Sequence, residues 1–152
     1  MTLLRAAYFQ ENWGTRLPGV LASGSLSHGL RSDLKFPQVA TADIGQHAVR
    51  LLLDPVAQGT RLVELAGPEE LSLQDTAALI SRLSGKPVQV VTVPIEGMIG
   101  GMISTGAPAE LAALYGELAD GINRGIVAWE GGRAVAVRGK TTLEQTLCRL
   151  LG

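Results

Sequence analysis

A cluster of aromatic and polar residues near the start of the chain has the residue types of a ligand site. Its members are Tyr8, Phe9, Glu11, Asn12 and Trp13. The cluster closes an apolar run over residues 2–8 that predicts a β-strand, and in open α/β sheets ligands bind beyond the carboxyl ends of strands. Residue types alone favour core packing for Phe9 and Trp13, because aromatic side chains are usually buried.

No motif for covalent or metal catalysis accompanies this cluster. The sequence has no G-x-S-x-G element, no Cys near a His and no His/Cys group at metal-ligand spacing, so the catalytic residues stay unknown and no metal is expected. The glycines at 24 and 29 lack the Lys-Ser/Thr of a P-loop, and those at 97, 100 and 101 follow G-x-x-G-G rather than G-x-G-x-x-G. His28 and His47 are predicted to lie at the surface.

Composition restricts the classes of partner. The 152 residues are 46% hydrophobic and 18% charged, which suits one folded domain and argues against disorder. A net charge of −1 without a Lys/Arg cluster argues against a nucleic-acid partner. The apolar runs are too short to span a membrane, so no membrane partner is expected. The lone Cys148 excludes an internal disulfide and favours the reducing cytoplasm.

The stretch from Val39 to Val91 must hold the framework that positions the cluster. Apolar spacing predicts a helix with Thr41 as its N-cap, and a β-rich run predicts a strand over residues 61–66. A second helix begins at Ser72, with Asp75 at the spacing of a capping box, and a second strand covers residues 88–93. Strand, helix and strand at this spacing predict a right-handed parallel βαβ unit.

Three further segments have readable patterns. Residues 17–36 are rich in Gly and Ser, and we expect short extended pieces and turns that form a surface loop. Pro108 is well placed to begin a helix. The buried stripe of that helix is predicted to be Leu111, Tyr115, Leu118 and Ile122. Thr141 or Thr142 should cap a final helix.

Five segments in this order and spacing resemble the C-terminal half of NmrA-like proteins, which are atypical short-chain dehydrogenase/reductases that bind NAD(P). The segments are Arg5–Trp13, Phe36–Gly45, Val63–Pro68, Gly85–Val88 and Gly139–Glu144. The resemblance covers essentially the whole chain. It implies that residues 1–152 form a single α/β domain, a partial Rossmann-like parallel sheet with flanking helices. The match of Phe9, Asn12 and Trp13 implies the edge of the nicotinamide and substrate pocket.

The resemblance also implies that a part is missing. In the family the glycine-rich turn that holds the pyrophosphate lies in the N-terminal half, and this chain has no counterpart of that half. The family pattern has Pro after the arginine of the first segment, where this chain has Ala6. NAD(P) is therefore implied by the family only, and we expect no sub-micromolar binding of NAD(P)H by this chain alone.

Three functions remain open at this stage. The chain can be the substrate-side half of an NAD(P)-dependent oxidoreductase that acts on a small organic substrate, completed by a partner chain or a dimer. It can be a non-catalytic binding or regulatory module derived from that family. A third alternative is a cofactor-free enzyme, such as an isomerase or cyclase, that reuses the pocket with Glu11 as general base.

A partner is expected on physical grounds. The first strand, with Leu3, Leu4 and Tyr8, would present the open edge that the missing half covers in the family. A chain with such an edge tends to associate, and its net charge is too small to prevent this. We therefore predict a homodimer, or a complex with an N-terminal-half partner, that buries the first strand or its flanking helices.

Overall fold

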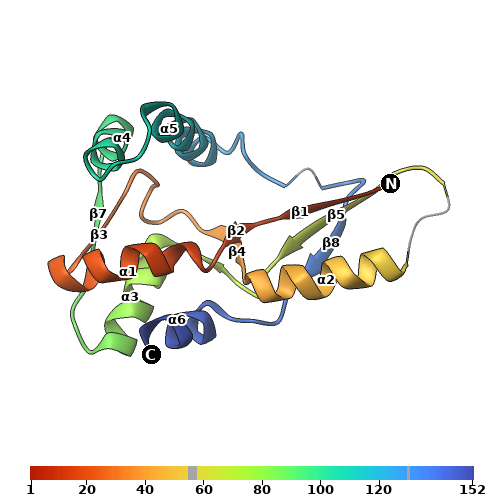
Figure 1. Ribbon diagram of the computed structural model, residues 1–152, viewed down its shortest axis with the longest axis horizontal. Helices are drawn as coiled ribbons and strands as arrows, with labels where there is room; N and C mark the ends of the chain where they lie inside the picture. Colours follow the sequence, from red (N-terminus) through yellow and green to blue (C-terminus); the bar gives the residue numbers. More distant parts are fainter. Residues whose placement is uncertain (55–57, 130) are drawn as a thin grey trace.

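The computed structural model describes residues 1–54, 58–129 and 131–152, in which strands alternate with helices (Figure 1). The strands are β1 Thr2–Ala6, β2 Tyr8–Phe9, β3 Ser25–His28, β4 Phe36–Val39, β5 Arg61–Ala66, β6 Glu70–Leu71, β7 Gln89–Thr92 and β8 Val135–Arg138. The helices are α1 Asn12–Ser23, α2 Thr41–Leu53, α3 Leu73–Ser84, α4 Ile95–Ser104, α5 Ala109–Asn123 and α6 Leu143–Leu151.

The strands form three small sheets that are mostly parallel. One sheet has the order β1-β5-β8, a second has the order β2-β4-β6, and the third pairs β3 with β7. Only the β4–β6 pair is antiparallel among the described residues. The α/β class with parallel strands and flanking helices is therefore confirmed.

The predicted βαβ unit is wrong in its pairing. Both strands and the helix between them exist, but β7 pairs with β3, whereas β5 lies between β1 and β8. Val63 at the centre of β5 is in register with Leu4 on one side and Val135 on the other. An apolar run predicts that a strand is buried, but it does not specify which strand lies beside it.

Helix α1 takes up residues 17–23 of the predicted surface loop. Trp13, Leu17 and Val20 lie at i, i+4 and i+7, so their burial against the core stabilises a helix through Pro18. The helix ends at Gly24, which has a φ of 67° and whose N–H donates to the Val20 carbonyl. The loop prediction gave too much weight to Gly and Ser and too little to this spacing.

The capping motifs behave as predicted at two helices. Ser72 and Asp75 form a reciprocal capping box at α3, and Thr142 and Gln145 form one at α6. At α2 the predicted N-cap is wrong by one residue, because Ala40 occupies the N-cap position and Thr41 is the first residue of the helix. These helices lie with α1 on one side of the strands, while α4 and α5 form a hairpin on the opposite side (Figure 1).

Two hydrophobic clusters hold these layers together. The larger joins α1, α3 and α6 to β3 and β4, with Trp13, Leu26, Ile80 and Leu147 among its buried members. The smaller centres on Leu65. In the part of the chain that is described, no helix combines the length and the hydropathy that crossing a membrane requires.

Candidate substrate pocket

A cavity of about 550 Å³ opens where β1 ends, between β2 and β4 on one side and α5 on the other. Its apolar walls include Tyr8, Phe9, Phe36, Tyr115, Leu118, Ile122, Val127 and Trp129. Its polar side chains are few and come from Asn12, Lys35 and Glu70, besides the tyrosine hydroxyls. A largely apolar cavity with a few converging polar groups is the usual form of a small-molecule site.

A second hollow, of about 610 Å³, lies over the start of α6, between Thr141 and Arg149. It is wide open to solvent and is lined mainly by polar side chains, so it cannot enclose a small molecule. The cavity beyond β1 is the better candidate because it combines aromatic walls with a strand's carboxyl end.

Three of the five predicted ligand-binding residues line the cavity. They are Tyr8, Phe9 and Asn12, and the Phe9 side chain is 42% exposed, which is unusual for a phenylalanine. Trp13 is only 1% exposed, and its Nε1–H donates to Gln38 Oε1 at 2.9 Å inside the larger core cluster. Asn12 and Trp13 are consecutive residues of α1, and the side chains of consecutive helical residues point about 100° apart. The two side chains therefore face different surroundings.

Glu11 also lies outside the cavity lining. Both of its carboxylate oxygens accept from the Thr41 backbone N–H at 3.0 Å, at the N-terminus of α2. A carboxylate is favourable there because it compensates the positive end of the helix dipole. This arrangement gives Glu11 a structural partner and does not support its use as a general base in the cavity.

Helix α5 has the opposite orientation to the one predicted. Its buried face consists of the small residues Ala112, Gly116 and Ala119, while Tyr115 is 47% and Leu118 is 41% exposed. A side chain at Gly116 would collide with Ile99 of α4, so only small residues allow the two helices to pack. The large apolar stripe therefore faces the cavity and solvent, and this is why sequence reasoning missed Tyr115 and Leu118 as site residues.

Tyr8 is placed to act as a hydrogen-bond donor in the cavity. Burial raises the pKa of its hydroxyl, although the Arg16 guanidinium and a hydrogen bond with the Asn12 side chain lower it in part. The ring is held edge-on against Phe36, with 5.7 Å between centroids. Tyr8 thus stays protonated at neutral pH and keeps a fixed orientation.

His28 lies in β3 and is half-buried rather than at the surface, contrary to the prediction. Burial lowers the pKa of its imidazole to about 4, and the charge of Arg16 contributes in the same direction. The Leu30 N–H donates to His28 Nδ1 at 3.1 Å, so the neutral ring carries its proton on Nε2.

We expect acid to destabilise the protein through His28. Because the folded-state pKa is lower than that of the unfolded chain, about 6.5, the stabilisation is complete above pH 6.5 and is lost as pH falls towards 4. Between pH 7 and pH 5 the free energy of unfolding should fall by about 2 kcal/mol from this residue alone.

Urea unfolding at several pH values measures this effect. His28→Gln should remove most of the dependence between pH 7 and pH 5. The matched control is His47→Gln, because the sequence contains only these two histidines. Equal slopes in the wild type and His28→Gln would contradict the assignment.

The N-termini of α2 and α3, which could bind a pyrophosphate, are occupied by the chain's own groups. The N-terminus of α2 holds the Glu11 carboxylate, and that of α3 holds the Ser72–Asp75 capping box. The turn after β1, residues 7–11, contains no glycine. The segment after β1 and the N-termini of α2 and α3 therefore do not fit the pyrophosphate of NAD(P). The described residues contain no group of three or more His, Cys, Asp or Glu residues that could hold a metal ion.

Curated relatives are oxidoreductases. Agroclavine dehydrogenase from Claviceps fusiformis is 30% identical over 120 residues, covering 77% of this chain and 41% of that enzyme. Quinone oxidoreductase 2 from Escherichia coli is 28% identical over 124 residues, covering 82% of this chain and 43% of that enzyme. No protein-family model matches the sequence.

Solved structures extend the likeness over nearly the whole chain. The NADPH-dependent quinone oxidoreductase from Escherichia coli, complexed with NADPH, has a TM-score of 0.82 and 25% identity, covering 99% of this chain and 53% of that one. This chain has the fold of about half of that reductase. Triphenylmethane reductase from Citrobacter sp., complexed with NADP(H), has a TM-score of 0.80 at 20% identity, covering 98% of this chain and 52% of that one.

The comparisons confirm the predicted resemblance at the level of NAD(P)-binding oxidoreductases. The chain spans about half the length of the relatives it matches. Its assignment to the C-terminal half of an NmrA-like protein stays a prediction.

Proposed function

We propose that this chain is the substrate-side half of an NAD(P)-dependent oxidoreductase that acts on a small, flat, uncharged organic substrate such as a quinone. The aromatic cavity beyond β1 is the observation that carries the proposal, because its walls suit a planar ring. The names of the relatives support the reaction class, since they include a quinone oxidoreductase and a dehydrogenase.

The residues of the cavity can bind and polarise such a substrate. Phe9, Tyr115 and Trp129 provide apolar surfaces that exclude water from a ring. The Tyr8 hydroxyl and the Asn12 amide can donate hydrogen bonds to a ring oxygen and stabilise negative charge that develops on it during reduction. A hydride donor such as NADPH would supply the electrons, and the N-termini of α2 and α3 are not free to hold its phosphates.

The dinucleotide must then be bound by residues outside this chain. We propose that they come from an N-terminal half on a separate or longer polypeptide, with a second copy of the chain as the alternative partner. The outer edge of β1 is the expected contact, since β1 pairs only with β5 among the described residues and its Leu3 is 43% exposed. Light scattering behind a sizing column distinguishes a homodimer from a monomer.

The Asn12 amide gives the direct test of the cavity. We expect Asn12→Ala to weaken binding of 1,4-naphthoquinone about tenfold, the value of one hydrogen bond of roughly 1.4 kcal/mol, with little change in stability. Trp129 lines the cavity, so quenching of its fluorescence reports binding. Gln46→Ala on α2 is the control, because Gln46 is exposed and lies outside the cavity lining.

Two outcomes would count against the proposal. The cavity is not a quinone site if the wild-type chain fails to bind naphthoquinone at concentrations up to its solubility. A loss of stability in Asn12→Ala that accounts for the loss of affinity would mean that Asn12 has only a structural role.

The second candidate is a binding or regulatory module without catalysis. The occupied N-termini of α2 and α3 favour it, because neither of them is free to bind a pyrophosphate. Calorimetric titration with NADPH and NADH, with and without a dinucleotide-binding partner, separates the two. Naphthoquinone binding with NADPH consumption in the presence of the partner supports the oxidoreductase, whereas binding without consumption supports the module.

A further inference from the structure

The segment that connects β3 to β4, residues 29–35, joins the two walls of the cavity. Its last two residues, Leu34 and Lys35, and the following Phe36 line the cavity on the side of β4. The opposite wall is the stripe of α5 that includes Tyr115 and Ile122. The separation between these walls therefore depends on how the 29–35 segment is attached to α5.

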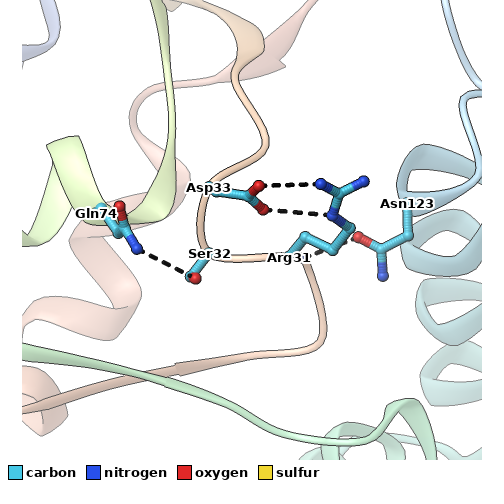
Figure 2. Close-up of polar contacts among 5 residues, drawn as sticks. All are labelled: Arg31, Ser32, Asp33, Gln74 and Asn123. Carbon is cyan, nitrogen blue, oxygen red and sulfur yellow. Dashed lines mark hydrogen bonds and ion pairs between the residues drawn. The ribbon is translucent and has the colours of Figure 1, made fainter.

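Asn123, the last residue of α5, makes that attachment with both ends of its side-chain amide. Its Nδ2 donates to the Gly29 carbonyl oxygen at 2.8 Å. Its Oδ1 accepts from the Arg31 N–H at 2.9 Å (Figure 2). The two partners are 94 and 92 residues away in the sequence. Asn123 follows directly after Ile122, so the contact fixes the end of the helix that lines the cavity.

Helix α4 packs on the same segment. A side chain at Gly29 would meet the Met98 sulfur at 3.0 Å, which shows that the segment's backbone lies directly against α4. Leu30 is buried in the larger core cluster together with Met98 and Ala119. The 29–35 segment is therefore one place where the α4–α5 hairpin meets the body of the protein.

The other side of the segment is fixed to the body. The Gln74 N–H donates to the Ser32 carbonyl oxygen at 3.2 Å, and the Gln74 side chain approaches the Ser32 hydroxyl at 3.4 Å. Arg31 bends back onto Asp33, with its Nη2 3.0 Å from the carboxylate (Figure 2). The 29–35 segment is thus attached to α3 through Gln74, and Asn123 attaches the same segment to α5 through its side-chain hydrogen bonds.

We propose that Asn123 is a positioning residue for the cavity, which holds α5 at the distance where Tyr115 and Leu118 face Tyr8 and Phe9. The role of the cavity in ligand binding rests on the proposed function. The hydrogen bonds between Asn123 and the 29–35 segment are a property of the fold. A flat ligand needs both walls in contact, so loosening one wall should shorten the lifetime of the complex more than it slows ligand entry. Asn123 would not touch the ligand, because it is absent from the cavity lining.

Hydrogen exchange in the wild type and in Asn123→Ala tests whether Asn123 holds α5 in place. In Asn123→Ala, the amides of α4 and α5 should exchange about tenfold faster, in proportion to the loss of two modest hydrogen bonds, while β5 and α3 keep their rates. Gln74→Ala is the matched control, since it removes a weak side-chain contact of the same segment and leaves α5 attached. Unchanged exchange, or equal acceleration throughout the protein, would overturn the role of Asn123.

Stopped-flow quenching of Trp129 tests the functional half. Naphthoquinone should dissociate roughly tenfold faster from Asn123→Ala than from the wild type, and at the wild-type rate from Gln74→Ala. Faster exchange in α5 with unchanged dissociation would overturn the claim that Asn123 positions the cavity. If the wild type binds no naphthoquinone, the proposed function fails. Hydrogen exchange still decides whether Asn123 holds α5 in place. Asn123→Asp, which keeps the acceptor for Arg31 and loses the donor to Gly29, serves if the alanine variant does not fold.

Discussion

Replacing Asp43 by alanine is expected to lower the free energy of unfolding by about 4 kcal/mol. The carboxylate is 4% exposed and accepts three hydrogen bonds from the segment before α6. The donors are the Lys140 N–H at 2.9 Å, the Thr141 N–H at 2.9 Å and the Thr141 hydroxyl at 3.1 Å. Hydrogen bonds to a charged group contribute about 1.5 to 3 kcal/mol each, and the alanine would leave these donors without a partner.

The local geometry leaves little room for a replacement contact. A side chain at Gly139 would collide with the Asp43 carboxylate, so the two segments already touch. Chemical unfolding in urea measures the loss, and Asp54→Ala provides the control because Asp54 is an exposed carboxylate at the far end of the same helix. A loss below about 1 kcal/mol would mean that water replaces Asp43 as the acceptor.

The second large effect is expected at Trp13. Trp13→Ala should lower the free energy of unfolding by about 4 kcal/mol, because it removes the largest fully buried side chain and leaves a cavity. Trp13→Phe should cost about 2 kcal/mol, since it keeps most of the volume but leaves Gln38 Oε1 without the indole N–H. The difference between the two variants separates packing from hydrogen bonding.

The same variants distinguish a core residue from a ligand-binding one. Thermal and urea unfolding give the stability, and Trp129 fluorescence gives naphthoquinone affinity at temperatures where each variant is folded. We expect Trp13→Phe to retain affinity within about threefold, because Trp13 lies outside the cavity lining. Loss of affinity at unchanged stability would restore Trp13 to the binding residues.

Local signals in the sequence predicted much of the fold. The capping boxes at α3 and α6 depend only on residues three positions apart, and the structure contains both. The pairing of β7 with β3 could not be predicted in this way, because it depends on contacts between segments more than 60 residues apart. The spacing of Trp13, Leu17 and Val20 indicates helix α1, but the glycines and Pro18 within it favoured the prediction of a loop.

The residues of the candidate site were also predicted only in part. Tyr8, Phe9 and Asn12 follow the end of a strand, and general knowledge of α/β sheets was enough to predict their position. Glu11 and Trp13 are their neighbours in sequence, but they point elsewhere, towards α2 and the core. Tyr115 and Leu118 escaped because α5 has two apolar faces, and periodicity does not say which one is buried.

The two faces of α5 have a consequence for how this protein can diversify. On its small face against α4, a methyl group at Gly116 would collide with the Ile99 side chain. The large stripe carries the cavity wall, and its members Tyr115 and Leu118 remain more than two-fifths exposed. Mutations in the stripe can therefore alter the shape of the accepted molecule without a matching loss of stability. A fold with this property can acquire new substrates one substitution at a time.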